Sequence, residues 1–398
     1  MNLFVDGSIS VELKNTVFLQ VLNIYPEEKL TERPIFKEAL DRGCIDFNLL
    51  RSECEKISLA WQFFFLDDIN LKRQIDHIED QRKIKISAKL FSKRQGIGKI
   101  TSKRIVDRLI RQQNYLLENN DFPTNDFCGL LDGDFSSFAN LIRDYFEIDM
   151  QYFWRIKSKG DALGYLVKQV EKKNINVSRG VLTNGILPYL QSSRDVYKNT
   201  SGFIISDYKV PFIFLPSEIN PDEVDSRQIY TLLYLLSLIG LDKHQYSLDK
   251  ELNAIEIKEL SQTEKKVHFI VGEFLMPSNE TSSINNSNLD KNMLRDLGDK
   301  YKISPTALLT ILLIRKNISR EKYKKLLPPP FNKDLQKKRI LTTPNISTSV
   351  KKFCGIHSYE AINIGIRTNQ LPSTQAQYLL FGCMNKKRYM KYCKELNI

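Results

Sequence analysis

Residues 229–240, Ile-Tyr-Thr-Leu-Leu-Tyr-Leu-Leu-Ser-Leu-Ile-Gly, form the longest apolar run of the chain. An apolar run without alternating polar positions is typical of a helix that is packed inside a protein core. Its length of about a dozen residues is too short to cross a bilayer core of roughly 30 Å. We therefore expect a buried helix at this point of the sequence.

The segments on either side of this run predict a hairpin and a second helix. Residues 201–215 contain two short β-branched and aromatic stretches that meet at Asp207–Lys209, which predicts two paired strands. Residues 264–277, Glu-Lys-Lys-Val-His-Phe-Ile-Val-Gly-Glu-Phe-Leu-Met-Pro, predict an amphipathic helix that ends at Pro277. The expected order is thus hairpin, buried helix, amphipathic helix.

In chain order these segments read G-F, P-x-I, Y-T-L and E-F-L-M-P, and this order resembles the ImmA/IrrE family of metallopeptidases. The E-F-L-M-P ending and its distance from the apolar helix are the most specific part of the resemblance. The matching residues are Gly202, Phe203, Pro211, Ile213, Tyr230, Thr231, Leu232, Glu264, Phe274, Leu275, Met276 and Pro277. The resemblance implies a zincin-like core, with a preceding strand at 174–177, a helical unit at 294–319 and, at 358–383, the C-terminal tail of the longer bacterial members.

The zinc motif of that family, H-E-x-x-H, is replaced in this chain. The motif places two histidines on one helix face with a Glu beside them as general base. Here Tyr234 stands in the first His position, Leu235 in the Glu position and Leu238 in the second His position. Leucine has no lone pair, and a phenol with a pKa of about 10 is a poor zinc ligand. We therefore expect a pseudo-peptidase with no catalytic residue, no metal and no other cofactor.

Glu264 is the one zinc-ligand position of the family that this sequence keeps. A catalytic zinc site needs three protein ligands and a water, so one carboxylate is not enough. Because Lys265 and Lys266 follow it, Glu264 is expected to be a solvated residue in the first turn of its helix. A metallopeptidase with relocated ligands at His244, Glu264 and His268 remains an alternative, since His268 follows Glu264 by one helical turn.

Positive charge is concentrated between Arg82 and Arg111, where Asp107 is the one opposing carboxylate. Such a stretch attracts phosphate backbones in a salt-dependent way, so a nucleic-acid-binding transcriptional regulator is the second functional hypothesis. The residues assigned to nucleic acid are Lys89, Lys93, Arg94, Lys99, Lys103, Arg104 and Arg108. An ordinary solvated surface that pairs with the acidic residues of 67–80 is an equally open interpretation.

Residues 290–316 have the outline of a helix-turn-helix, in which Ser304 would cap the second helix and Pro305 would be its first residue. A recognition helix presents polar side chains to base edges, whereas residues 307–314 are apolar nearly all round. We therefore expect this segment to be a packing unit rather than a reader of DNA sequence.

Length and composition agree with a cytoplasmic protein of two to three domains. We expect a basic helical region at 1–120, a degenerate peptidase-like domain at 121–280 and a helical region at 281–398. The fold class is α+β, predominantly helical, with a small mixed sheet. The six cysteines form no C-x-x-C pair and are expected to be reduced, and the N-terminus lacks the pattern of a secretory signal.

Without zinc ligands, the function that the sequence predicts is binding. The resemblance implies a setting in bacterial or phage mobile elements, toxin–antitoxin systems or phage defence, where such proteins cleave or bind helix-turn-helix repressors or pair with a toxin. We expect a protein partner (a toxin, a repressor or a defence component), with nucleic acid as a second candidate and no membrane.

Overall fold

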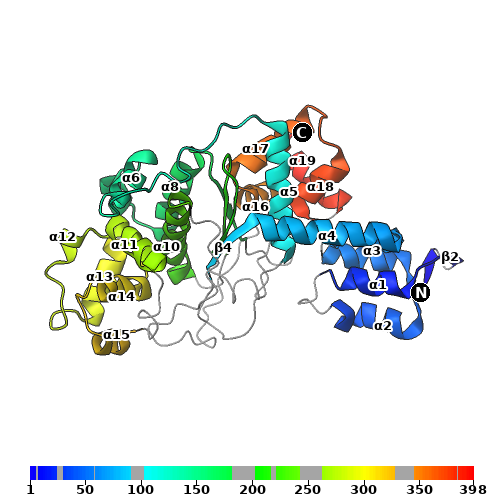
Figure 1. Cartoon of the computed structure of the whole chain (residues 1–398). Helices are drawn as coiled ribbons and strands as arrows, with labels where there is room; N and C mark the ends of the chain where they lie inside the picture. The colour runs from blue at the N-terminus through cyan, green and yellow to red at the C-terminus, as the bar shows by residue number, and fades with distance from the viewer. Residues whose placement is uncertain are drawn as a thin grey trace.

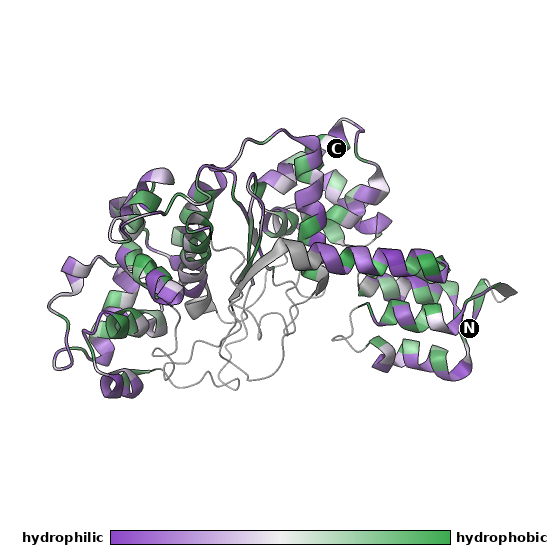
Figure 2. Cartoon of the chain, viewed as in Figure 1, coloured by the Kyte–Doolittle hydropathy of each residue, from purple (hydrophilic) through white to green (hydrophobic). Residues whose placement is uncertain are grey.

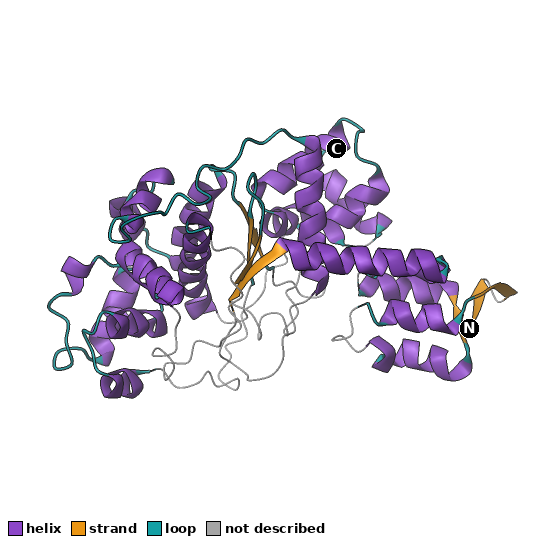
Figure 3. Ribbon diagram, viewed as in Figure 1, coloured by secondary structure: helices purple, strands orange, loops and turns teal. Residues whose placement is uncertain are grey.

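The computed structural model of the chain is predominantly helical with a small mixed sheet, as the sequence predicted (Figure 3). No helix among the described residues is both long and apolar enough to cross a membrane. The structure describes residues 1–5, 8–24, 30–57, 59–90, 103–181, 202–216, 221–242, 262–327, 345–382 and 384–398.

The N-terminal unit combines a three-stranded sheet with short helices around an aromatic core (Figure 1). The strand order is β2-β1-β3, with β1 antiparallel to β2 and parallel to β3. The ring of Phe18 lies 6.5 Å from that of Phe36 and 4.9 Å from that of Phe64, measured between centroids. The elements are β1 (Asn2–Val5), β2 (Ser8–Glu12), α1 (Asn15–Leu22), η2 (Leu30–Glu32), α2 (Pro34–Arg42), β3 (Cys44–Asp46), α3 (Phe47–Lys56) and η3 (Trp61–Phe65).

A second sheet, with the strand order β4-β6-β7-β5, forms the centre of the remaining chain. β6 (Gly202–Ile205) and β7 (Phe212–Leu215) are antiparallel and confirm the predicted hairpin. β5 (Asn176–Arg179) is parallel to β7. It confirms the strand expected at 174–177, before the hairpin, although the observed strand begins two residues later. β4 (Ile86–Leu90), which the sequence did not predict, pairs antiparallel with β6 at one edge.

Both faces of this sheet are buried under helices (Figure 1). Side chains alternate between the faces of a strand, so Ile204 and Ile213 enter one hydrophobic core while Phe203 and Phe214 enter the other. A strand that is covered on both sides cannot alternate polar with apolar residues. This is the reason why both strands of the hairpin are continuously apolar.

One face of the sheet carries the α10 layer, which we define as the helices between residues 138 and 326. Its central helix is α10 (Pro221–Gly240), the predicted buried helix, which contacts β6, β7, α8 (Lys159–Glu171) and α11 (Gln262–Leu275). Every residue of α10 from Gln228 to Gly240 is buried. The other helices are α6 (Phe138–Tyr145), α7 (Met150–Arg155), α12 (Ser278–Thr281), α13 (Lys291–Lys300), α14 (Pro305–Ile314) and α15 (Arg320–Leu326).

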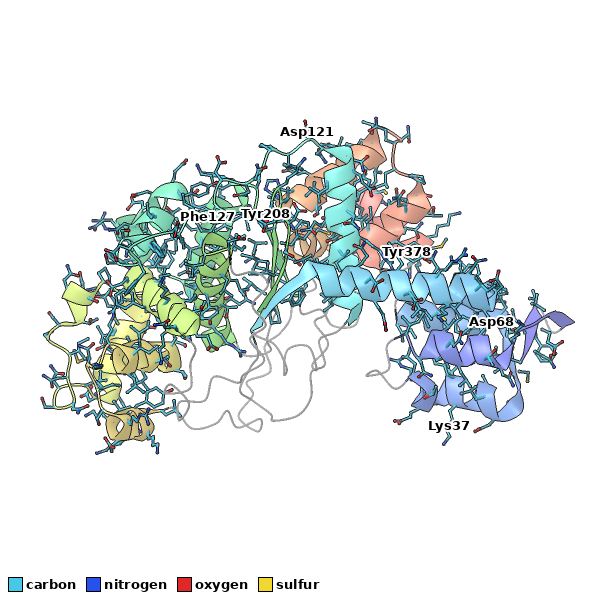
Figure 4. All side chains as sticks on the ribbon, in the orientation of Figure 1. Lys37, Asp68, Asp121, Phe127, Tyr208 and Tyr378 are labelled. Carbon is cyan, nitrogen blue, oxygen red and sulfur yellow. The ribbon has the colours of Figure 1, made fainter. Side chains whose placement is uncertain are left out.

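The opposite face carries the C-terminal layer, made of α5 and the last four helices of the chain. A long helix, α4 (Asp68–Lys85), runs from the N-terminal unit to β4, and the part of it that Figure 2 colours is mostly hydrophilic. The hydroxyl of Tyr378 in the C-terminal layer donates to Gln62 Oε1 of the N-terminal unit at 3.1 Å (Figure 4). The helices are α5 (Lys103–Asn119), α16 (Ile346–Cys354), α17 (Ile356–Arg367), α18 (Ser373–Phe381) and α19 (Lys386–Leu396).

The second helix of the predicted helix-turn-helix outline is a packing unit, as expected. The Ser304 hydroxyl accepts a hydrogen bond from the Ala307 backbone N–H at 3.2 Å, and Pro305 is the first helical residue. Leu308 and Leu312 are fully buried in the core of the α10 layer. The leucines of this helix therefore serve core packing.

The hydrophobic cores group the chain differently from the ranges 1–120, 121–280 and 281–398. The core of the N-terminal unit ends at Leu71, whereas α5 shares a core with α16–α19 and with one face of the sheet. The core of the α10 layer extends from Phe127 to Leu326. A shared core does not by itself define a domain, so the predicted domain boundaries stay a prediction. A domain boundary at residue 280 would divide the core of the α10 layer, and one at residue 120 would separate α5 from the sheet with which it shares a core.

Gly202 allows β6 to approach α10 closely. A Cβ atom at this position would lie 2.9 Å from the Phe214 carbonyl oxygen, 2.9 Å from Thr231 Cγ2 and 3.1 Å from Leu235 Cδ1. Backbone and fully buried side chains surround it, so these atoms have little room to move. The absence of a side chain at Gly202 therefore sets the distance between the sheet and its central helix.

We expect Gly202→Ala to lower the free energy of unfolding by about 1–3 kcal/mol, since overpacking forces the sheet and the helix apart. Gly164→Ala in α8 is the control, because a Cβ there meets no atom within 4 Å. That change should raise stability by up to about 1 kcal/mol through helix propensity. Urea unfolding of both variants measures the difference, and equal effects would contradict the close approach of β6 to α10.

Candidate functional site

The three positions of the expected zinc motif lie inside the core of the α10 layer. Tyr234 and Leu235 have no exposed surface, and Leu238 is 1% exposed. They lie in the part of α10 from Gln228 to Gly240, which is buried between the sheet, α8 and α11. Leu235 and Leu238 give this region of α10 a hydrocarbon surface, which offers no electron pair to a cation.

The polar chemistry of this region comes from Tyr230 and from His268 of the neighbouring helix. The Tyr230 hydroxyl lies 2.6 Å from His268 Nδ1, and both side chains are buried. The ring of Tyr234 lies against the same imidazole, with 5.0 Å between the ring centroids. Two tyrosines one helical turn apart on α10 thus hold a single histidine of α11.

Burial determines the protonation state of this group. Removal from water lowers the pKa of His268 from 6.5 to about 4, so the imidazole is neutral near pH 7. Burial also raises the pKa of the Tyr230 hydroxyl, against the opposing influence of the Arg315 cation, so that the phenol keeps its proton. Among the described residues, His268 Nε2 has no hydrogen-bond partner. The pair is therefore neutral, with one polar nitrogen left over.

Glu264 is buried, and its expected position on the solvated surface is wrong. The residue is 5% exposed although it lies in the first turn of α11 and precedes two lysines. It lies one helical turn before His268 and so shares the buried side of the helix with it. The charge of its neighbours suggested a surface position, but the direction in which α11 packs decides its burial.

The alternative metal site at His244, Glu264 and His268 stays a prediction, because the structure describes two of its three ligands. His244, one of the three ligands of the relocated site, lies outside the described residues. Within the described part of the chain, no three His, Cys, Asp or Glu side chains are grouped so that they could hold a metal ion. Glu264 and His268 share a helix face, but a catalytic zinc site requires a third protein ligand.

Arg315 is a buried charged residue beside this region that the sequence analysis missed. Its guanidinium donates to Glu273 Oε1 at 2.7 Å and to the Met276 carbonyl oxygen at 2.6 Å, and Nη1 donates to Thr281 Oγ1 at 3.0 Å. These bonds tie the C-terminal end of α14 to the C-terminal end of α11. An arginine directly after an apolar helix was the available signal, but its partners are remote in sequence.

Arg108, one of the residues assigned to nucleic acid in the stretch 82–111, is buried. Arg108 is 5% exposed, its Nε donates to the Leu379 carbonyl oxygen at 3.2 Å, and its guanidinium carbon lies 4.2 Å from the centroid of the Phe353 ring. Its assignment to a phosphate contact is wrong, because the side chain is buried between α5, α16 and α18.

The other residues assigned to nucleic acid are not brought together by the structure. Lys93, Arg94 and Lys99 lie outside the described residues. Lys89 belongs to β4, and Lys103 and Arg104 begin α5, but the positions of their side chains are outside the described part. Their role in binding stays a prediction.

Comparison with known proteins adds no assignment to this geometry. No family model, no curated protein and no solved structure matches the chain. The arrangement of Tyr230, Tyr234, Glu264 and His268 therefore has to be interpreted from its own chemistry.

We expect His268 to make stability depend on pH. Its folded-state pKa of about 4 lies below its ordinary value of 6.5, so its contribution is complete above pH 6.5 and is lost as the pH falls towards 4. His268→Gln keeps a hydrogen-bonding group for Tyr230 but removes this titration. The stability advantage of the parent over the variant should shrink by about 2 kcal/mol between pH 7 and pH 5, as measured by urea unfolding.

His77→Gln in α4 provides the matched control, because it makes the same exchange at an exposed side chain. Glu171, whose pKa burial raises to about 7, contributes a slope of opposite sign. That contribution is common to parent and variants and cancels in the difference. Parallel stability curves for the parent and His268→Gln would show that His268 does not titrate as a buried neutral group.

Proposed function

We propose that the chain is a catalytically inactive, ImmA/IrrE-like pseudo-peptidase that acts by binding a protein partner. The observation that carries this proposal is the chemistry of α10, where Tyr234, Leu235 and Leu238 fill the positions of the zinc motif and are buried. A peptidase of this type polarises a carbonyl group and activates a water at a zinc ion. Tyr234, Leu235 and Leu238 supply neither the ligands nor the general base for that chemistry.

The arrangement of the elements supports a zincin-like origin. A hairpin, β6 and β7, lies against a long helix, α10, and α11 then crosses the same helix. At the matched residue Gly202, β6 lies so close to α10 that a Cβ atom would come within 2.9 Å of Thr231 Cγ2. Glu264, the retained ligand position, is buried on α11, a helix that packs against α10. Each of these features follows the order of the family.

The zinc that this family implies does not fit the residues present. Two of the three ligand positions are Tyr234 and Leu238, and the buried imidazole nearby already has the Tyr230 hydroxyl at its Nδ1. In place of metal coordination, the tyrosine–histidine contact links α10 with α11. We therefore derive no hydrolytic step, and binding is the activity left to the scaffold.

The partner class follows from the proposed family. A toxin, a repressor or another defence component encoded near this chain would be held by a rigid scaffold that cannot cleave it. Because interfaces gain affinity from buried apolar and aromatic side chains, such a partner should remain bound at moderate salt. Co-purification of the tagged full chain from its native host at 150 and 500 mM salt, followed by chemical crosslinking, identifies it.

Metal analysis tests the pseudo-peptidase assignment directly. We expect the purified chain to carry far less than one zinc per molecule and to cleave neither casein nor a co-purified partner. In the variant Tyr234→His/Leu235→Glu/Leu238→His, two imidazoles join Glu264, and we expect about one zinc per chain. Zinc should also raise the melting temperature of this variant, since a ligand that binds only the folded state stabilises it.

The matched control adds Glu264→Gln to the reconstructed variant, which should remove zinc binding and the thermal shift. Stoichiometric zinc in the unmodified chain would overturn the pseudo-peptidase assignment. Failure of the folded, reconstructed variant to bind zinc would overturn the zincin-like placement of α10 and α11. Cleavage activity with little metal would argue for a different kind of enzyme.

A further inference from the structure

The helix α19 carries the strongest local excess of positive charge among the described helices of the C-terminal layer. Its five cationic residues are accompanied by one carboxylate, Glu395. The wider segment 345–398 contains eight Lys and Arg residues against two Asp and Glu residues. The cations of α19 are Lys386, Lys387, Arg388, Lys391 and Lys394.

Glu395 is occupied elsewhere and does not neutralise these lysines. Its carboxylate accepts hydrogen bonds from the backbone N–H groups of Ile346 at 3.3 Å and Ser347 at 2.9 Å. It thereby compensates the positive end of the α16 dipole. The other carboxylate of the segment, Glu360, lies on α17.

The inner face of α19 is fixed, so its outer face has a defined geometry. Tyr392 has no exposed surface, its hydroxyl donates to Asn363 Oδ1 at 2.7 Å, and its ring lies 6.0 Å from that of Phe381. Lys387, Lys391 and Lys394 are exposed and follow each other at intervals of four and three residues. This spacing places them in one row of about 10 Å along the helix.

The three lysines of this row have no ion-pair partner among the described residues. Several lysines elsewhere do have one: Lys14, Lys173 and Lys300 each approach a carboxylate oxygen at 2.7 Å. The row therefore keeps its full positive charge on the surface. Unpaired charges in a row raise the local potential and attract a polyanion.

We propose that the exposed lysine row of α19 binds the phosphate backbone of duplex DNA. Lysine is a compact point charge that meets phosphates without reading bases, so the binding is independent of sequence. Duplex DNA carries a charge every ~1.7 Å along its axis, so three ammonium groups within about 10 Å can each reach a phosphate. The helix lies on the backbone and does not enter a groove, because its opposite face is packed on Asn363 and Phe381.

The composition of the outer face favours a duplex over a single strand. Proteins that hold single strands stack the bases on exposed aromatic rings. In α19, Tyr392 is buried and Tyr389 is half-buried, and the exposed residue between the lysines is Met390. This face thus offers charge but no stacking surface, and the location differs from the stretch 82–111.

Fluorescence anisotropy of the full chain with a mixed-sequence duplex of about 20 base pairs tests this proposal at salt concentrations between 50 and 200 mM. We expect the parent to bind with an affinity that falls steeply with salt. In Lys387→Gln/Lys391→Gln/Lys394→Gln the slope of log affinity against log salt should decrease by about 2.7, since each lost phosphate contact removes ~0.9. The affinity at 0.1 M salt should fall on the order of 10²-fold.

Lys316→Gln/Lys324→Gln/Lys325→Gln is the matched control, because these lysines are equally exposed and the change in net charge is the same. It should keep the slope of the parent, and circular dichroism should show the same helix content for all three proteins. Equal slopes for both triple variants, or no salt-dependent binding by the parent, would overturn the proposal. Tighter binding of a single strand, of duplex RNA or of a polyglutamate peptide than of duplex DNA would overturn the choice of DNA. None of these outcomes bears on zinc binding by α10.

Discussion

The burial of both faces of the β6–β7 hairpin is the constraint on which the rest of the structure depends. Its strands are apolar at every position and need helices on each side, and a sheet that is covered twice is a strong organiser of a fold. The α10 layer and the C-terminal layer meet this need from segments far apart in sequence. Gly202 then sets how closely the first of these layers approaches.

The chemistry of α10 follows from that position. From Gln228 to Gly240 this helix is enclosed by the sheet, α8 and α11, so a polar group in that part must find a partner within the protein. Tyr230 meets this requirement through His268, whose imidazole stays neutral because burial disfavours the cation. The link between α10 and α11 is thus a hydrogen bond and a ring contact. Leu235 and Leu238 add hydrocarbon to this region, which offers no electron pair to a cation.

Charged groups, by contrast, lie where they keep water or gain several partners. Arg315 is nearly buried, but it donates to a carboxylate, a carbonyl oxygen and a hydroxyl, which together offset its desolvation. The lysines of α19 remain in water and keep their charge. The exposed lysines of α19 are thus available for the proposed contact with DNA.

The sequence alone determined the hairpin, the buried helix and the capped helix α14, because apolar runs, prolines and a capping serine act over a few residues. It also determined that Leu235 and Leu238 cannot hold a metal, since this follows from residue type. Only the tertiary structure decided that β4 completes the central sheet and that α5 shares a core with the last helices of the chain. The burial of Glu264 and Arg108 was likewise decided by the tertiary structure. Burial depends on which remote segment covers a side chain, and the charges of neighbouring residues do not predict that segment.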